Sequence, residues 1–393
     1  MPRLFLQRCA SVAALVILAS LAASKPATAA PVELDQSRVV NAADARAIDK
    51  AAAAYLAESV DGNPGLWLAV WDPKRGYYEQ AYGSAVSGGR KASTKDVMYV
   101  GSITKTALAT AVLEEVAKGA ISLGDTVGQL SPALAAKFPA IASISVRDLL
   151  GMTSGIPDYA DAAVAQMLVN PQKRYSRDDL IALGLASGEQ KPVGTAAYST
   201  TNYIILGELL QAVTGQSPER LVNAVLREAG LGQARLPSSD AKQPARITHG
   251  YIGRLLPTQL PDVAVPPPAT DVTDWAFDWG REGGGAYATI GDLAQWGSTC
   301  LGNSLLPTQL VRQRLRTHTS NAGQYGLGII RQGQWLAHSG QALGWTANVA
   351  CNPKTGAVVA YATNSTNGTF DVPFKVGKVA FPAYAKAIAY GAL

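Results

Sequence analysis

The chain has 393 residues, of which 48% are hydrophobic and 16% are charged, and its formal net charge is +5. This composition is typical of a globular protein of one or two domains and excludes a disordered or fibrous chain. Residues 1–29 carry three basic residues and no acidic one, so the net charge of the rest falls to +2. That small excess predicts neither a nucleic-acid partner nor binding to a membrane surface.

Residues 1–29 have the pattern of a secretory signal peptide. Two arginines precede an apolar run over residues 10–21, and Ala-Thr-Ala at residues 27–29 is a typical cleavage site. A transmembrane anchor is the less favoured alternative, because the run is shorter than the ~20 residues that a bilayer requires. We therefore expect a periplasmic or secreted mature chain with no stable membrane span.

The mature chain would carry two cysteines, Cys300 and Cys351. In an oxidising compartment they either form a disulfide or lie buried apart, and the sequence leaves both alternatives open. Two cysteines and three histidines form no metal-ligand pattern, so we expect no metal and no other cofactor.

The secondary-structure signals divide the mature chain into three parts. A helix is predicted over residues 41–59, followed by two strands joined by a turn, at residues 66–72 and 76–83. Helical segments broken by glycine and proline then fill residues 101–321, with a proline-rich loop near residues 255–275. Strand signals return at residues 325–332, 333–340, 344–352 and 356–364, before a closing helix within residues 372–391.

The order of these elements predicts an α/β (α+β) fold. An antiparallel sheet built from both chain ends, residues 30–100 and 321–393, would be flanked by helices. Residues 101–320 would form an inserted, mostly helical domain, and we expect the active site between the two.

A candidate nucleophile lies in the stretch YVGSITKT, where Ser102 precedes Lys105 by three residues. The spacing alone is weak evidence, because Ser239 and Lys242 repeat it in a loop. On a helical wheel, however, Lys105 lies on the apolar face, where desolvation lowers the pKa of a lysine toward neutrality. Ser102 would lie at the helix N-terminus, which favours developing negative charge. This context predicts a serine nucleophile with a lysine base.

Other catalytic patterns are missing from the sequence. It contains no Gly-x-Ser-x-Gly elbow, no paired carboxylates, no phosphate-binding loop and no dinucleotide fingerprint. An ordinary α/β-hydrolase triad and a nucleotide-dependent enzyme are therefore disfavoured.

Two later segments extend the pattern around Ser102. GTAAYSTTNYIILG places Tyr198 just before a helix, and QWLAHSGQALGW places His338, Ser339 and Gly340 on a strand. Taken singly, a tyrosine or histidine in such places is more often a core residue. With YVGSITKT and ISVRDLLGMTSGIPDY in the same order, the mature chain resembles the serine penicillin-recognising enzymes. The resemblance is to the branch of class C β-lactamases, D-alanyl-D-alanine carboxypeptidases, D-aminopeptidases and related esterases. It is nearest to exported carboxypeptidases with a His-x-Gly third motif.

The resemblance implies the following catalytic roles. Ser102 would attack the scissile carbonyl, while Lys105 and the phenol of Tyr198 would move its proton to the leaving group. The oxyanion would lie between the backbone N–H groups of Ser102 and Gln341, donors of a kind worth about two to three orders of magnitude each.

The resemblance also implies that residues 338–340 lie on the strand that binds the substrate. His338, Ser339 and Gly340 would border the substrate, and His338 would stand where many relatives have lysine and so shape the charge above the site.

The chain departs from the family pattern at three positions. The family's asparagine two residues after the tyrosine is Thr200, whose hydroxyl cannot replace both the donor and the acceptor of an amide. The carboxypeptidase branch has a carboxylate-binding arginine where this chain has Ile330, and Arg331 would point to the opposite face of its strand. Met152 replaces the usual histidine before TSG, with a consequence expected for packing only.

Two kinds of function follow from the resemblance. The favoured one is an exported serine hydrolase acting on a D-alanyl-D-alanine peptide or a related D-amino-acid amide, with a β-lactam or small ester as alternative substrates. The other is a weakly active penicillin-recognising binding module. The expected partners are small molecules or peptides such as the peptidoglycan stem peptide.

Overall fold

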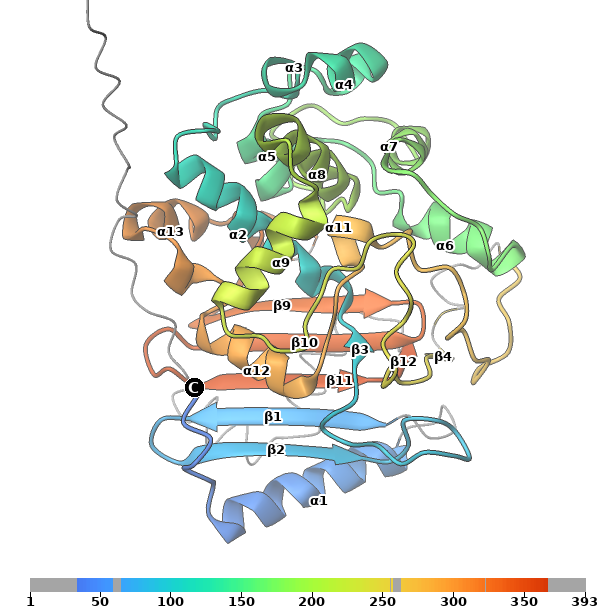
Figure 1. Ribbon diagram of the computed structural model, residues 1–393, viewed down its shortest axis with the longest axis vertical. Helices are drawn as coiled ribbons and strands as arrows, with labels where there is room; N and C mark the ends of the chain where they lie inside the picture. The colour runs from blue at the N-terminus through green and yellow to red at the C-terminus, as the bar shows by residue number, and fades with distance from the viewer. Residues whose placement is uncertain (1–33, 59–64, 255, 257–262, 322, 367–393) are drawn as a thin grey trace, which may run out of the picture.

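The computed structural model describes residues 34–58, 65–254, 256, 263–321 and 323–366. The expected signal peptide and the closing helix lie outside these residues. Within these residues the main sheet has eight strands in the order β2-β1-β11-β10-β9-β8-β7-β6, with antiparallel neighbours, and Figure 1 shows the part from β2 to β9. Its strands are β1 Leu66–Asp72, β2 Gly76–Tyr82, β6 His318–Ser320, β7 Gly323–Tyr325, β8 Ile330–Gln332, β9 Trp335–Ala342, β10 Trp345–Cys351 and β11 Val358–Thr363.

The sheet is covered on both faces, which explains why its central strands read as continuous apolar runs. In β1, Leu66 and Leu68 pack with Ile48 of α1 (Ala42–Glu58), whereas Trp67 and Ala69 belong to the larger core on the other face. This alternation follows from the two-residue period of a strand. Helix α12 (Ile290–Ser298) contacts β1, β10 and β11.

The remaining helices lie mostly between the first two strands and β6 in sequence, and Figure 1 shows α2, α5, α7, α8 and α9 gathered on the β9 side of the sheet. Side-chain caps start many of them, as at Ser176, whose hydroxyl accepts from the Asp179 N–H in a capping box. None of the described helices has the length and apolarity that crossing a membrane requires. These helices are α2 Thr104–Ala117, α3 Val127–Leu130, α4 Pro132–Lys137, α5 Val146–Gly151, α6 Ala160–Val169, α7 Arg177–Ala186, α8 Thr201–Thr214, α9 Pro218–Glu228, α11 Arg281–Gly284 and α13 Thr308–Arg314.

Short elements connect the sheet to the helices. They are the paired strands β3 Met98–Tyr99 and β5 Tyr287–Ala288, the paired strands β4 Tyr251–Ile252 and β12 Ser365–Thr366, and the 3-10 helices η1 Gly101–Ile103, η2 Pro139–Ile141 and η3 Asn303–Leu305. The η1 turn leads directly from β3 into α2, so it fixes where α2 begins.

The predicted fold class is confirmed, with one error in strand placement. The single strand expected over residues 325–332 is two strands, β7 and β8, because the backbone turns at Gly328, whose φ is 72°. Gly326 N–H donates to the Ile329 carbonyl across this turn. A left-handed φ of this kind favours glycine and interrupts a strand. The short strands β3, β4, β5, β6 and β12 were not predicted.

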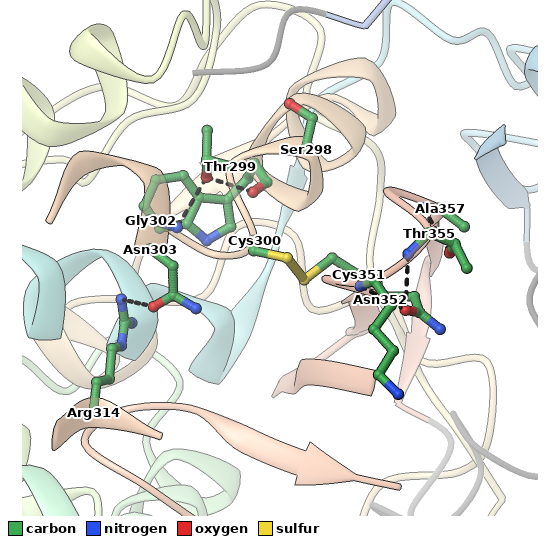
Figure 2. The surroundings of a disulfide bond; sticks show 12 residues. Ser298, Thr299, Cys300, Gly302, Asn303, Arg314, Cys351, Asn352, Thr355 and Ala357 are labelled. Atoms are coloured by element: carbon green, nitrogen blue, oxygen red, sulfur yellow. Dashed lines mark hydrogen bonds between the residues drawn. A yellow bond between two sulfur atoms is a disulfide. The ribbon is translucent and has the colours of Figure 1, made fainter. Parts of the chain in front are cut away.

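A disulfide joins Cys300, after α12, to Cys351 at the end of β10 (Figure 2). The two Cα atoms are 5.4 Å apart, within the usual range for a bridge. Of the two alternatives that the sequence left open, the structure therefore has the disulfide. It ties the helix that covers the sheet to a central strand.

Candidate active site

Ser102 and Lys105 lie at the junction of η1 and α2. Lys105 Nζ lies within hydrogen-bond distance of Ser102 Oγ, at 2.9 Å, and the whole Lys105 residue is buried. The apolar face predicted for Lys105 corresponds to this burial. Ser102 is 8% exposed, so its hydroxyl remains at the edge of the interior.

Three oxygen atoms surround Lys105 Nζ. Besides Ser102 Oγ, it contacts Thr200 Oγ1 at 3.3 Å and the Gly283 carbonyl oxygen at 2.6 Å. Burial lowers the pKa of Lys105 to about 7, although the negative charge of Asp158 acts in the opposite direction. A substantial fraction of Lys105 is therefore a neutral amine near neutral pH, which is the form that accepts a proton.

Asp158 is a member of this cluster that the sequence analysis did not select as a site residue. Thr200 Oγ1 donates to Asp158 Oδ2 at 3.1 Å, and the Ala160 N–H donates to Asp158 Oδ1 at 3.0 Å. Burial raises the pKa of Asp158, while Lys105 and these hydrogen bonds lower it. The signal was present in the TSGIPDY segment, but nothing in the sequence indicated that its aspartate would contact Thr200.

Tyr198 covers the other side of the lysine. Its ring centre lies 5.0 Å from Lys105 Nζ, and a hydrogen bond with the Ser102 side chain lowers its pKa. Burial has the larger effect and keeps the pKa of Tyr198 well above its ordinary value. The phenol is therefore protonated at neutral pH and can serve as a proton donor.

Strand β9 crosses directly over η1. A Cβ atom on Gly340 would lie 1.8 Å from the Val100 carbonyl oxygen and 2.9 Å from Ser102 N. A Cβ on Gly101, where φ is 53°, would lie 2.5 Å from Gln341 N. β8 pairs with β9 only as far as Ala337, so η1 occupies the position next to the following part of β9. The backbones of Ser102 and Gln341 are thereby brought together, as an oxyanion hole requires.

His338 is buried and points into a network of tyrosines. Its Nδ1 lies 2.6 Å from the Ser339 carbonyl, which only accepts, so Nδ1 carries the proton and Nε2 accepts from the Tyr325 hydroxyl at 3.1 Å. Burial lowers the pKa of His338 to about 3. His338 is therefore neutral at neutral pH. It does not supply the positive charge that a lysine at this position would bring to the site.

Ser339 is buried and stands opposite Asn348 in the register of β9 and β10. With His338 and Gly340, it belongs to the segment of β9 that passes the nucleophile.

The other departures from the family pattern also have structural consequences. Ile330 is buried, whereas Arg331 is exposed and donates to the Gly333 carbonyl, so these neighbours face opposite sides of β8. Met152 does more than fill space, because its sulfur accepts the Ser199 N–H at 3.3 Å and the Asn202 side-chain N–H at 3.6 Å. The expectation of a packing role alone is therefore wrong for Met152.

The structure thus brings together Ser102, Lys105, Tyr198 and Thr200, with Gly340 and Gln341 of β9 beside the serine. Sequence reasoning missed the Gly283 carbonyl and Tyr325 as well as Asp158. In the part of the chain that the structure describes, we find no group of three histidine, cysteine, aspartate or glutamate residues that could hold a metal ion.

Comparison with known proteins gives a family match over most of the chain. A family model described as Beta-lactamase matches residues 52–380. Penicillin-binding protein 4* of Bacillus subtilis is 25% identical over 285 residues, which are 68% of this chain and 60% of that protein. Protein flp of Staphylococcus aureus is 24% identical over 316 residues, 77% of this chain and 60% of that protein. The matches thus span about 60% of the length of these two relatives.

Two solved structures share the fold over nearly their full lengths. The D-amino acid amidase of Ochrobactrum anthropi SV3 superposes with a TM-score of 0.75 at 19% identity, covering 90% of this chain and 100% of that one. A D-stereospecific amidohydrolase of Streptomyces superposes with a TM-score of 0.70 at 23% identity, covering 86% of this chain and 98% of that one. At these identities the likeness shows a common fold.

Proposed function

Because the chain belongs to the beta-lactamase family, we propose that it is an exported serine hydrolase that forms an acyl-enzyme on Ser102. One observation carries the proposal: Lys105 Nζ lies 2.9 Å from Ser102 Oγ in a site where burial lowers the lysine pKa to about 7. A serine hydroxyl is a weak nucleophile unless a base stands within hydrogen-bond reach. Lys105 lies within this reach, and its lowered pKa makes it a usable base near neutral pH.

Acylation follows from the positions of these groups. Ser102 Oγ forms a bond to the substrate's carbonyl carbon as its proton passes to Lys105 Nζ, and the carbonyl oxygen takes the negative charge. The N–H groups of Ser102 and Gln341 stabilise that charge. When the intermediate collapses, the bond to the leaving nitrogen breaks, and this nitrogen takes a proton from Tyr198, which Lys105 replaces.

Deacylation reverses these roles. Water attacks the ester carbon and loses a proton to the neutral amine of Lys105, which Ser102 Oγ no longer needs as a base. The bond to Ser102 Oγ then breaks, and the serine recovers its proton. The products are a carboxylic acid and the free enzyme, with no net change in protons on the protein.

We infer that the substrate is a D-amino-acid amide or peptide, of the kinds that D-amino-acid amidases and D-alanyl-D-alanine carboxypeptidases hydrolyse. Two structural neighbours described as a D-amino acid amidase and a D-stereospecific amidohydrolase support this class. Ile330 is apolar, Arg331 faces away from it and His338 is neutral. These residues favour a substrate without a free carboxylate at its leaving end, since a buried carboxylate needs a cation or several donors.

The disulfide supports export. Disulfides persist mainly in oxidising compartments such as the periplasm and the extracellular space. A bridge between Cys300 and Cys351 agrees with a mature chain that leaves the cytoplasm after removal of residues 1–29. We further propose that the site lies between a sheet domain and an inserted helical domain, as the sequence predicts.

A matched substrate panel tests the proposed class. The mature protein would be incubated with the D- and L-enantiomers of alaninamide and phenylalaninamide, a D-alanyl-D-alanine peptide, a chromogenic β-lactam and a p-nitrophenyl ester, with Ser102→Ala as control. We expect release of ammonia from the D-amides, dependent on Ser102 and at least tenfold faster than from the L-amides.

Other results would replace this assignment. Preferred release of D-alanine from the peptide would indicate a carboxypeptidase, and preferred opening of the β-lactam would indicate a β-lactamase. Covalent labelling by a penicillin without turnover of any substrate would indicate a binding module. Thr200 is the feature that favours this last alternative, because it lacks the amide donor expected there.

A further inference from the structure

Thr200 forms a bridge between Asp158 and Lys105. Its hydroxyl oxygen lies 3.1 Å from Asp158 Oδ2 and 3.3 Å from Lys105 Nζ. A hydroxyl has one proton to donate, and an ionised carboxylate only accepts. The Thr200 proton is therefore directed to Asp158, and the oxygen can only accept from Lys105.

This bridge fixes the orientation of the lysine amine. The Gly283 carbonyl, 2.6 Å from Nζ, is also an obligatory acceptor. A neutral amine has two N–H donors and one lone pair in a tetrahedral arrangement. When Thr200 and Gly283 take the two N–H groups, the lone pair is left facing Ser102 Oγ at 2.9 Å. A base is efficient only when its free pair points at the proton that it removes.

We propose that Asp158 is a positioning residue that acts through the Thr200 hydroxyl to aim the lone pair of Lys105 at Ser102. The proposal rests on the proposed function, since it concerns how Ser102 becomes a nucleophile. It also gives Thr200 a definite role. The Thr200 hydroxyl accepts from Lys105, as the carbonyl oxygen of the expected asparagine would, but its one proton goes to Asp158. It therefore offers no N–H donor to a substrate.

The charges around Lys105 give a second consequence. Tyr198 and Tyr203 cover Nζ as protonated phenols, and neutral His338 and Tyr325 lie behind them. On the α11 side, buried Glu282 is paired with Arg177. Asp158 is the carboxylate whose charge raises the pKa of Lys105. Removing its charge should therefore lower the lysine pKa and extend reactivity to lower pH.

The test uses labelling of Ser102 by an alkyl fluorophosphonate, a small probe that needs an activated serine but no substrate pocket. Its rate would be measured against pH by mass spectrometry for wild type, Asp158→Asn, Thr200→Val, Thr200→Ser and the double variant Asp158→Asn with Thr200→Val. Asp161→Asn is the matched control, because Asp161 is an exposed carboxylate three residues from Asp158 on α6. Thermal melting would show that each variant is folded.

We expect the acid limb of Asp158→Asn to move to lower pH by about one unit, with a maximal rate about tenfold below wild type. Thr200→Val should lose about tenfold as well, and Thr200→Ser, which keeps the hydroxyl, should regain most of that loss. Asp161→Asn should retain the wild-type rate and profile. Because the two residues act as one unit, the double variant should be no slower than Thr200→Val alone.

Two results would overturn the proposal while leaving the serine mechanism in place. One is a pH profile of Asp158→Asn equal to that of wild type. The other is a double variant whose loss is the product of the two single losses. If Asp158→Asn does not fold, equal rates for Thr200→Val and Thr200→Ser would overturn it too. Failure of wild type to label at Ser102 would instead overturn the proposed function and this inference together.

Discussion

Lys105 Nζ lies 2.9 Å from Ser102 Oγ, and no part of the lysine residue is exposed to solvent. The burial that makes this amine a base also opposes folding, because an ammonium group loses its hydration there. The same contact therefore links reactivity to stability, and both can be measured as a function of pH.

Replacing Lys105 with methionine should remove a pH dependence of stability. The folded-state pKa is about 7, below the ordinary 10.5, so between these values the unfolded chain binds a proton that the folded chain does not. Wild-type stability should therefore fall as the pH decreases from 10.5 to about 7, and this contribution should be constant below that. Denaturant unfolding at several pH values would show the free energy of unfolding of Lys105→Met rising relative to that of wild type as the pH decreases through this window. Parallel curves would contradict the lowered pKa.

Replacing Tyr198 with phenylalanine should reduce turnover without unfolding the protein. The phenol is hydrogen-bonded to the Ser102 side chain and stays protonated, so its removal deletes the donor for the leaving group. General acid catalysis of this kind is worth about 10²- to 10⁴-fold. Steady-state kinetics would show the loss in kcat with an amide substrate. A p-nitrophenyl ester should lose less, because its leaving group needs no proton, and an equal loss for both would argue against this role.

Replacing Gly340 with alanine should damage both the fold and the site. The new Cβ would lie 1.8 Å from the Val100 carbonyl oxygen, so β9 must move away from η1. Overpacking against backbone costs typically 1–3 kcal/mol, and we expect about 3 kcal/mol or more here. Gly232→Ala is the matched control, because a Cβ at that exposed position would meet nothing within 4 Å. Equal stability of the two variants would contradict the close crossing of β9 over η1.

The sequence predicts those features of the site that depend on the periodicity of a single helix or strand, namely which side chains are buried and which face they occupy. The apolar face of a helix indicated that Lys105 would be buried, and strand alternation separated Ile330 from Arg331. Contacts made across the fold could not be predicted in this way. Asp158 meets Thr200 through the packing of two segments 42 residues apart, and no periodicity in either segment encodes that contact. The neutral state of His338 likewise follows from its burial in the assembled fold, where it contacts Tyr325 of another strand.

Removing the disulfide should destabilise the whole fold. The bridge spans a sequence separation of 51 residues, and a loop of this length is worth about 4 kcal/mol in the chain-entropy view. Cys300→Ser combined with Cys351→Ser should lower the free energy of unfolding by about 2–4 kcal/mol, while Ser102 labelling of the folded fraction stays at the wild-type rate. Wild type under reducing conditions should behave in the same way. An unchanged melting temperature in both cases would show that the bridge contributes nothing.

The mechanism requires Ser102 to be the residue that becomes covalently modified, so a covalent adduct on Ser102 is its decisive test. The mature protein would be mixed with an alkyl fluorophosphonate, quenched, and analysed by intact mass and then by peptide mapping, alongside Ser102→Ala. We predict a mass increase equal to one phosphonyl group, with fluoride lost, on the peptide that contains Ser102, and none in the variant. No adduct, an adduct on another residue, or one that survives in Ser102→Ala would show that Ser102 is not the nucleophile.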